Sequence, residues 1–147
     1  MGLDSYIYRV EKDKPSPKEG PSDEILDEVW HARKANALHK WFVDNIQNGK
    51  DECQISLIPQ RKFEELKIIL DKISDYWYDS DLKHSSFDDR FKEIKDKCSE
   101  LLPTQSGFFF GPIEYDYYSY IYPILDLLIE IEYLDMEKYN YYYHASW

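Results

Sequence analysis

The residues best suited to bind a charged ligand lie in one short stretch of the chain. Arg33 and Lys34 are adjacent cations, and His39 follows within two helical turns. If a helix begins near residues 34–36, its N-terminal N–H groups and dipole join these charges, which is how proteins bind phosphates and other anions. We therefore predict a small-molecule site, of the nucleotide-binding kind, that includes Arg33, Lys34, Asn36, His39 and Trp41.

The same stretch also fits an ordinary amphipathic helix. An unbroken helix from Glu24 to Asn48 would bury Trp30 and Trp41, and it would place His39 on the nearly opposite, solvated side. Lys34 falls in the middle of the apolar stripe, so it either extends to solvent, stacks on a tryptophan or marks a helix break. The sequence leaves open both an anion site and a plain solvated surface.

A second group of polar residues opens the segment from Thr104 to Gly111. Thr104, Gln105 and Ser106 could present hydroxyl and amide groups to a ligand, so they join the predicted ligand-binding set. The glycine spacing matches neither a Walker A loop nor GxGxxG. The alternative is a tight connector or short buried strand whose phenylalanines fill the core.

No motif in the sequence indicates a particular reaction. The four histidines do not pair at i, i+4, and the two cysteines form no CxxC motif. The chain also lacks a GxSxG nucleophile elbow. We predict no metal and no cofactor. An enzyme that uses His39 or His144 remains a third hypothesis.

The C-terminal quarter is acidic and rich in tyrosine. Residues 112–147 carry seven acids and one base, a net charge of −6 within a chain of −11. Clustered aromatic side chains often anchor protein interfaces, whereas a solvated helix is the alternative. The predicted protein-binding residues are Glu114, Tyr115, Asp116, Tyr117, Tyr118, Tyr120 and Glu130.

Composition limits the class of protein. The 147 residues suit a single domain, residues 1–147, with a surface loop at 12–22. The acidic charge argues against direct nucleic-acid binding and favours a partner with a basic surface. The N-terminus resembles no signal peptide, and the longest apolar run is too short and too charged for a membrane span, so we expect a cytoplasmic protein.

Hydrophobic periodicity indicates an α+β domain, with a small mixed or antiparallel sheet packed against about four helices. The segment Asp75–Ser86 reads as a loop or frayed helix end, and Pro123 indicates that the last helix is kinked or starts late. The predicted elements are strands at Leu3–Val10, Cys53–Ile58, around Phe108–Phe110 and at Tyr141–Trp147, and helices at Glu24–Asn48, Arg61–Ile73, Phe87–Leu102 and Glu114–Tyr139.

Four blocks of the sequence resemble a family of short uncharacterised proteins from bacteriophages and prophages. The blocks are the opening MGLDxYxY, the central RKxNxLHxWF, the segment LLPTQSGFFFG and the ending YYYHASW. The resemblance implies a phage or mobile-element origin and no mechanism. It leads us to expect an interaction protein that binds and inhibits a host protein, such as an anti-defence (anti-CRISPR-like) factor in a bacterial cell. The alternatives are a nucleotide-type binding protein or an enzyme.

Overall fold

The computed structural model describes residues 2–17, 26–108 and 110–147. Within them, the framework is an antiparallel sheet of four strands in the order β2-β1-β4-β3. The strands are β1 (Asp4–Glu11), β2 (Asp27–Arg33), β3 (Ser56–Leu57) and β4 (Tyr139–Ser146). The predicted α+β class with a small antiparallel sheet is therefore confirmed.

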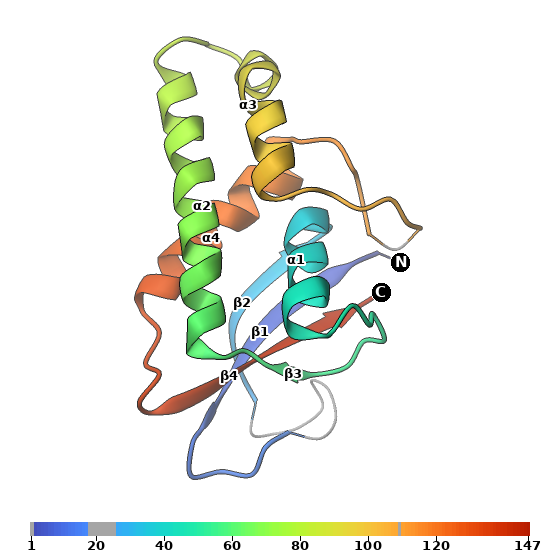
Figure 1. Ribbon diagram of the computed structural model, residues 1–147, viewed down its shortest axis with the longest axis vertical. Helices are drawn as coiled ribbons and strands as arrows, with labels where there is room; N and C mark the ends of the chain where they lie inside the picture. Colours follow the sequence, from blue (N-terminus) through green and yellow to red (C-terminus); the bar gives the residue numbers. More distant parts are fainter. Residues whose placement is uncertain (1, 18–25, 109) are drawn as a thin grey trace.

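The helices occupy one side of the sheet and extend beyond its end. They are α1 (Asn36–Ile46), α2 (Gln60–Asp81), α3 (Phe87–Leu101), the π-helical turn η1 (Tyr117–Ile121) and α4 (Tyr122–Glu132). In Figure 1, α1 and the start of α2 lie in front of the sheet, while the rest of α2 and the antiparallel α3 rise past it. No helix in the described ranges is long and apolar enough to cross a membrane.

Strands β1 and β4 pair along their whole length, from Asp4 opposite Ser146 to Glu11 opposite Tyr139. In β1, Ser5 and Ile7 are fully buried beneath the helices, while Tyr6 lies on the opposite face and is half-buried. This period of two is the strand pattern that the sequence showed at both ends of the chain. The strands predicted there are confirmed.

The helix predicted over Glu24–Asn48 is wrong in its first half. That half forms β2 from Asp27 to Arg33, and the helix begins only at Asn36. Between them Lys34 takes a positive φ of 55°, which turns the chain out of the sheet. Pairing with β1 outweighs the local helical spacing of Trp30 and its neighbours. Of the alternatives left open for Lys34, a helix start near residues 34–36 agrees with the structure, but the segment before it is a strand and not a helix.

The later elements differ from prediction mainly in their bounds. Helix α2 continues through the predicted loop as far as Asp81, because Trp77 packs in the core. The last helix does start late, since Pro123 occupies the first turn of α4. The triple-phenylalanine segment forms no strand among its described residues, and Phe108 is exposed.

Several predicted features fall on residues 18–25 or on Phe109, which lie outside the described ranges. They are the second half of the predicted surface loop, the first residues of the helix predicted from Glu24, and the middle of the triple-phenylalanine segment. The described part of that loop, residues 12–17, contains neither helix nor strand, and it ends at a buried Pro17.

Candidate functional site

Four aromatic side chains gather on the surface where α3 begins and η1 passes beside it. We call Phe87, Tyr117, Tyr118 and Tyr122 the aromatic face. The rings of Phe87 and Tyr117 are stacked, with centroids 5.0 Å apart and an interplanar angle of 7°. Tyr117 also contacts Tyr118 and Tyr122 edge-on, at 5.2 and 6.1 Å. Phe87, Tyr118 and Tyr122 are 50%, 78% and 55% exposed, so the face is a continuous aromatic surface open to solvent.

A buried cation supports this face from below. Arg90 lies over the ring of Trp77, with its guanidinium carbon 3.4 Å from the ring centroid. The same guanidinium donates hydrogen bonds to the Trp77 carbonyl at 2.6 Å and to Ser80 Oγ at 3.0 Å. Trp77 in turn packs against Phe87 and Tyr117. Since Arg90 and Trp77 are both buried and are joined by a hydrogen bond and a cation–π contact, they form a rigid base for the rings above them.

The π-helical turn explains why tyrosines accumulate on the surface here. The Asp116 carboxylate accepts hydrogen bonds from the Ser119 backbone N–H at 2.8 Å and from its hydroxyl, which starts η1. The wider π turn breaks the regular helical spacing of side chains, and such turns are common at functional sites. Tyr118 and Tyr122 are exposed along this turn, Tyr117 is half-buried against Trp77, and Tyr120 is buried.

Tyr120 was predicted to bind a protein, but the structure places it in the core. It is 2% exposed, and its hydroxyl donates to the carbonyls of Leu102 at 2.9 Å and Cys98 at 3.2 Å. Burial raises the pKa of Tyr120 far above its ordinary value. Its role is to join η1 to the end of α3, and no partner can reach its ring in this conformation.

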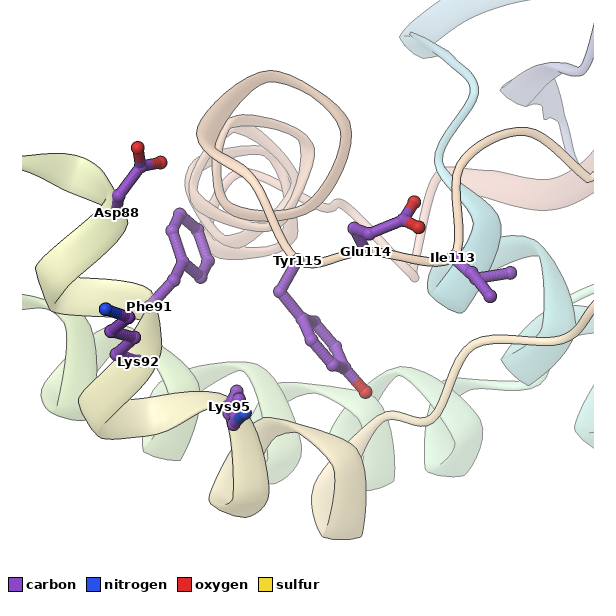
Figure 2. A pocket seen from close by; sticks show the side chains of 7 residues that line it. All are labelled: Asp88, Phe91, Lys92, Lys95, Ile113, Glu114 and Tyr115. Atoms are coloured by element: carbon purple, nitrogen blue, oxygen red, sulfur yellow. The ribbon is translucent and has the colours of Figure 1, made fainter.

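Next to the aromatic face lies a hollow of about 440 Å³ between α3 and the segment that precedes η1. Figure 2 shows the rings of Phe91 and Tyr115 on its two sides, with Ile113 at one end. Its rim carries two acids and two bases, Asp88, Glu114, Lys92 and Lys95. Phe91 follows Phe87 by one helical turn, so the hollow and the aromatic face form one surface.

The remaining predicted protein-binding residues lie on or near this surface. Glu114 is exposed beside the hollow, and Asp116 is half-buried because it caps η1. Glu130 lies farther along, toward the end of α4, and is half-buried. Of the predicted tyrosines, Tyr118 is exposed in this region and Tyr115 and Tyr117 are half-buried there, whereas Tyr120 lies in the core.

Several residues of this surface were missed by the sequence analysis. They come from α2 and α3 and not from the acidic segment: Trp77, Phe87, Arg90, Phe91, Lys92 and Lys95. The spacing of Phe87 and Phe91 on one helical face was a usable signal. The spacing cannot show that this helix face contacts residues 113–122, because that contact depends on the tertiary fold.

The predicted ligand-binding residues do not converge on one cavity. Arg33 and Lys34 are exposed, whereas Asn36 is buried and acts as a clamp. The Asn36 side-chain amide donates to the Gln105 carbonyl at 2.8 Å, and its oxygen accepts from the Gln105 N–H at 2.7 Å. Gly111 supports the same contact, because a Cβ there would come within 2.9 Å of Lys34 Cβ. Asn36 thus holds the loop against the start of α1.

The rest of this loop is also held by internal contacts. Thr104 Oγ1 donates to the Ile113 carbonyl at 3.1 Å, while the Gln105 and Ser106 side chains are exposed. Trp41 is buried and packs edge-on against Phe42, which confirms its expected place in the core. Hydrogen bonds therefore hold the loop against α1, and the predicted ligand-binding residues of the two segments do not line a common pocket among the described residues.

His39 is fully buried, which corrects its expected position on the solvated side of a long helix. Its Nδ1 lies 2.6 Å from the Tyr143 hydroxyl, and that hydroxyl lies 3.0 Å from Ser5 Oγ. Its Nε2 lies 3.0 Å from Asp51 Oδ2 but outside hydrogen-bond geometry. Burial lowers the pKa of His39 although Asp51 opposes the shift. Because α1 starts at Asn36 and not earlier, His39 faces the sheet.

The aromatic face, with its hollow and its rigid base of Trp77 and Arg90, is the described surface best suited to bind another molecule. It combines exposed rings, a concave apolar floor and charges of both signs at the rim. No family model, curated protein or solved structure matches the chain.

Proposed function

We propose that the chain is an interaction protein that binds a host protein through the aromatic face and inhibits it. The observation that supports this proposal is a cluster of exposed rings held over a buried Trp77–Arg90 pair. Exposed, preorganised aromatic side chains contribute most of the binding energy in many interfaces, because they bury a large area and lose little conformational entropy.

The partner that fits best has a basic surface with apolar side chains between the charges. Glu114 and Asp116 lie beside the rings, and residues 112–147 carry a net charge of −6, from seven acids and one base. Such charges steer a basic partner and repel nucleic acid. A groove that normally holds nucleic acid has this character, so a nucleic-acid-dependent defence effector is the kind of host protein that we propose. The resemblance to phage proteins agrees with this choice.

The test compares two tyrosines with nearly equal exposure. Tyr118 in the aromatic face is 78% exposed, and Tyr133 at the end of α4 is 77% exposed. A Tyr118→Ala/Tyr122→Ala variant should lose binding to a purified candidate effector in a calorimetric titration, and it should lose inhibition of its nuclease activity. Tyr133→Ala should keep both. Equal behaviour of the two variants would remove the aromatic face from the interface.

A charge-reversal variant tests the electrostatic part of the proposal separately. Glu114→Lys/Asp116→Lys should slow association and make the remaining binding less sensitive to salt. Because Asp116 caps η1, the single variant Glu114→Lys serves as the version that leaves the turn intact. Association rates that are the same in low and high salt for the unaltered chain would contradict a basic partner.

A further inference from the structure

The face of the sheet away from α1 carries a row of stacked rings. His31, Tyr6 and His144 lie opposite one another on β2, β1 and β4. The His31 and Tyr6 rings are almost parallel, at 8°, with centroids 4.6 Å apart. Tyr8 continues the stack along β1, at 5.6 Å and 14° from Tyr6. Parallel aromatic rings on a sheet face are a means of binding a nucleobase or another planar ring, and here Tyr8 and His144 are buried while the row is exposed at His31.

The outermost ring of this row is accessible and fixed. β2 is an edge strand, so His31 lies at the border of the sheet, and its side chain is 38% exposed. His31 Nε2 lies 2.9 Å from Asp4 Oδ1, which holds the imidazole upright against Tyr6. A planar ring that adds to the stack therefore meets a preorganised surface and costs little side-chain entropy.

Two cations lie next to the stack at the end of β2. Arg33 and Lys34 are both exposed, and both approach Gly2, whose added Cβ would lie 3.8 Å from Arg33 Nη2 and 3.7 Å from Lys34 Cε. Arg33 Nε is 3.6 Å from Asp4 Oδ1, so Asp4 is shared between Arg33 and His31. Of the two cations, Lys34 has no acid within ion-pair distance among the described residues. Lys34 is therefore the cation at this corner that can pair with an anionic group, because Arg33 already lies near the Asp4 carboxylate.

A second observation concerns the inner end of the row. His144 is 6% exposed, and its Nδ1 has no well-aligned hydrogen-bond partner among the residues that the structure describes, although the Cys53 backbone lies close enough to oppose the lowering of the His144 pKa by burial. Its ring lies 6.1 Å from Tyr6 and 6.4 Å from Tyr8. A buried polar atom without a partner costs free energy, so native structures usually supply a water molecule or a ligand group. The row therefore has an accessible ring, His31, at its outer end and a buried polar atom without a well-aligned partner at its inner end.

We propose that this row is a binding site for a free nucleoside monophosphate, whose base stacks on the outer side of His31, which Tyr6 supports from the other side, and whose phosphate contacts Arg33 and Lys34. A free nucleotide fits better than a polynucleotide, because the chain's net charge of −11 opposes a long phosphate backbone. This site is made by the sheet and is independent of the aromatic face, which is made by α3, η1 and α4. Of the ligand-binding residues predicted from the sequence, this site includes Arg33 and Lys34. The buried residues of that prediction are not part of the site, which instead uses Tyr6 and His31.

The test is a titration followed by two-dimensional amide NMR, with adenosine monophosphate, adenosine and inorganic phosphate as separate probes. Adenosine monophosphate should shift the amides of residues 4–8 and 30–34, and it should bind more tightly than adenosine or phosphate. His31→Ala and the double variant Arg33→Gln/Lys34→Gln should each weaken that binding by about tenfold, the range for loss of one base stack or of charged contacts.

Matched controls separate this site from general charge and from misfolding. His84→Ala and Arg61→Gln alter an imidazole and an exposed cation elsewhere, and both should keep full affinity. His31→Phe retains a stacking ring and should keep most of it. The unchanged remainder of each spectrum reports that a variant is folded.

Three outcomes would overturn the proposal. One is the absence of shifts with adenosine monophosphate at millimolar concentration. Another is equal binding of phosphate and adenosine monophosphate that His31→Ala does not alter, which would indicate charge alone. The third is tighter binding of a single-stranded oligonucleotide than of the mononucleotide, which would replace a free nucleotide with a nucleic acid as the ligand.

Discussion

The tyrosines of β4 and those of η1 come from the same acidic quarter of the chain but end in opposite environments. In β4, Tyr141 and Tyr143 are almost completely buried, and the Tyr143 hydroxyl bonds within the core. In η1, Tyr118 is exposed, and its half-buried neighbour Tyr117 contacts it edge-on. Strand alternation directs every second ring of β4 to the helices, whereas the π turn carries rings outward. Composition alone therefore cannot separate a core tyrosine from a binding tyrosine, and the backbone decides.

Truncation of a buried tyrosine is the strongest test of this contrast. Tyr143→Ala should lower the free energy of unfolding by about 3–5 kcal/mol, because it removes a large core ring that stacks on Phe42 at 4.1 Å. Urea unfolding measures the change. Tyr143→Phe, which keeps the ring and removes the hydroxyl near His39 and Ser5, should cost about 1–3 kcal/mol. A Phe variant as unstable as the Ala variant would show that the polar contacts dominate.

The Asn36 clamp is the next largest effect that we predict. Asn36→Ala should cost about 1–3 kcal/mol, since it leaves the Gln105 backbone groups without partners. Hydrogen exchange should then increase across residues 104–111. Asn45→Ala, whose amide donates only to the Trp41 carbonyl one turn earlier, is the matched control and should leave that loop protected. Unchanged exchange in Asn36→Ala would show that Gly111 packing alone holds the loop.

Acid should destabilise the sheet more than the aromatic face. Burial lowers the pKa of His39 and His144, so below about pH 6.5 the unfolded chain binds protons that the folded chain excludes. The free energy of unfolding should fall as pH decreases through that value, in addition to the acid sensitivity of carboxylates. Urea unfolding at a series of pH values measures this, and His144→Phe should reduce the slope. The same slope in both proteins would contradict the assignment to His144.

The smallest expected change in stability is at the aromatic face itself. Tyr118→Ala should alter the free energy of unfolding by no more than about 0.5 kcal/mol, because the side chain is mostly in solvent. Together with a large loss of partner binding, this result would establish that the ring serves recognition. A loss of stability as large as that of Tyr143→Ala would instead make Tyr118 a structural residue, and the difference between the tyrosines of β4 and η1 would not hold.

The spacing of apolar residues along the chain predicted those strands and helices that local sequence determines. The alternation in Leu3–Val10 and Tyr141–Trp147 gave the first and last strands correctly, and the break beside Lys34 was visible as a charge within an apolar stripe. The same reasoning failed at residues 27–33, because Trp30 and Trp41 happen to share helical spacing while the chain pairs with β1.

The candidate site was predictable only in part for the same reason. The acidic tyrosine cluster stood out in the sequence, but its base of Trp77 and Arg90 is contributed by a helix pair some 30 to 40 residues earlier in the chain. The hydrogen-bonded residues Asn36 and Gln105 are 69 positions apart in the sequence, and the local sequence around neither residue predicts their contact. Contacts between distant segments decide which candidates become surface and which become structural.

The position of β4 has a consequence for how the chain is made. β4 lies between β1 and β3 in the sheet, although it is the last of the four strands to be synthesised. While residues 139–146 are still being translated, β1 and β2 can form a hairpin, but the row of buried side chains that β4 supplies is missing. The α2–α3 pair, by contrast, is local and can form early. On the ribosome, the helical half should therefore gain structure first, and the sheet should close in a late step that involves both ends of the domain.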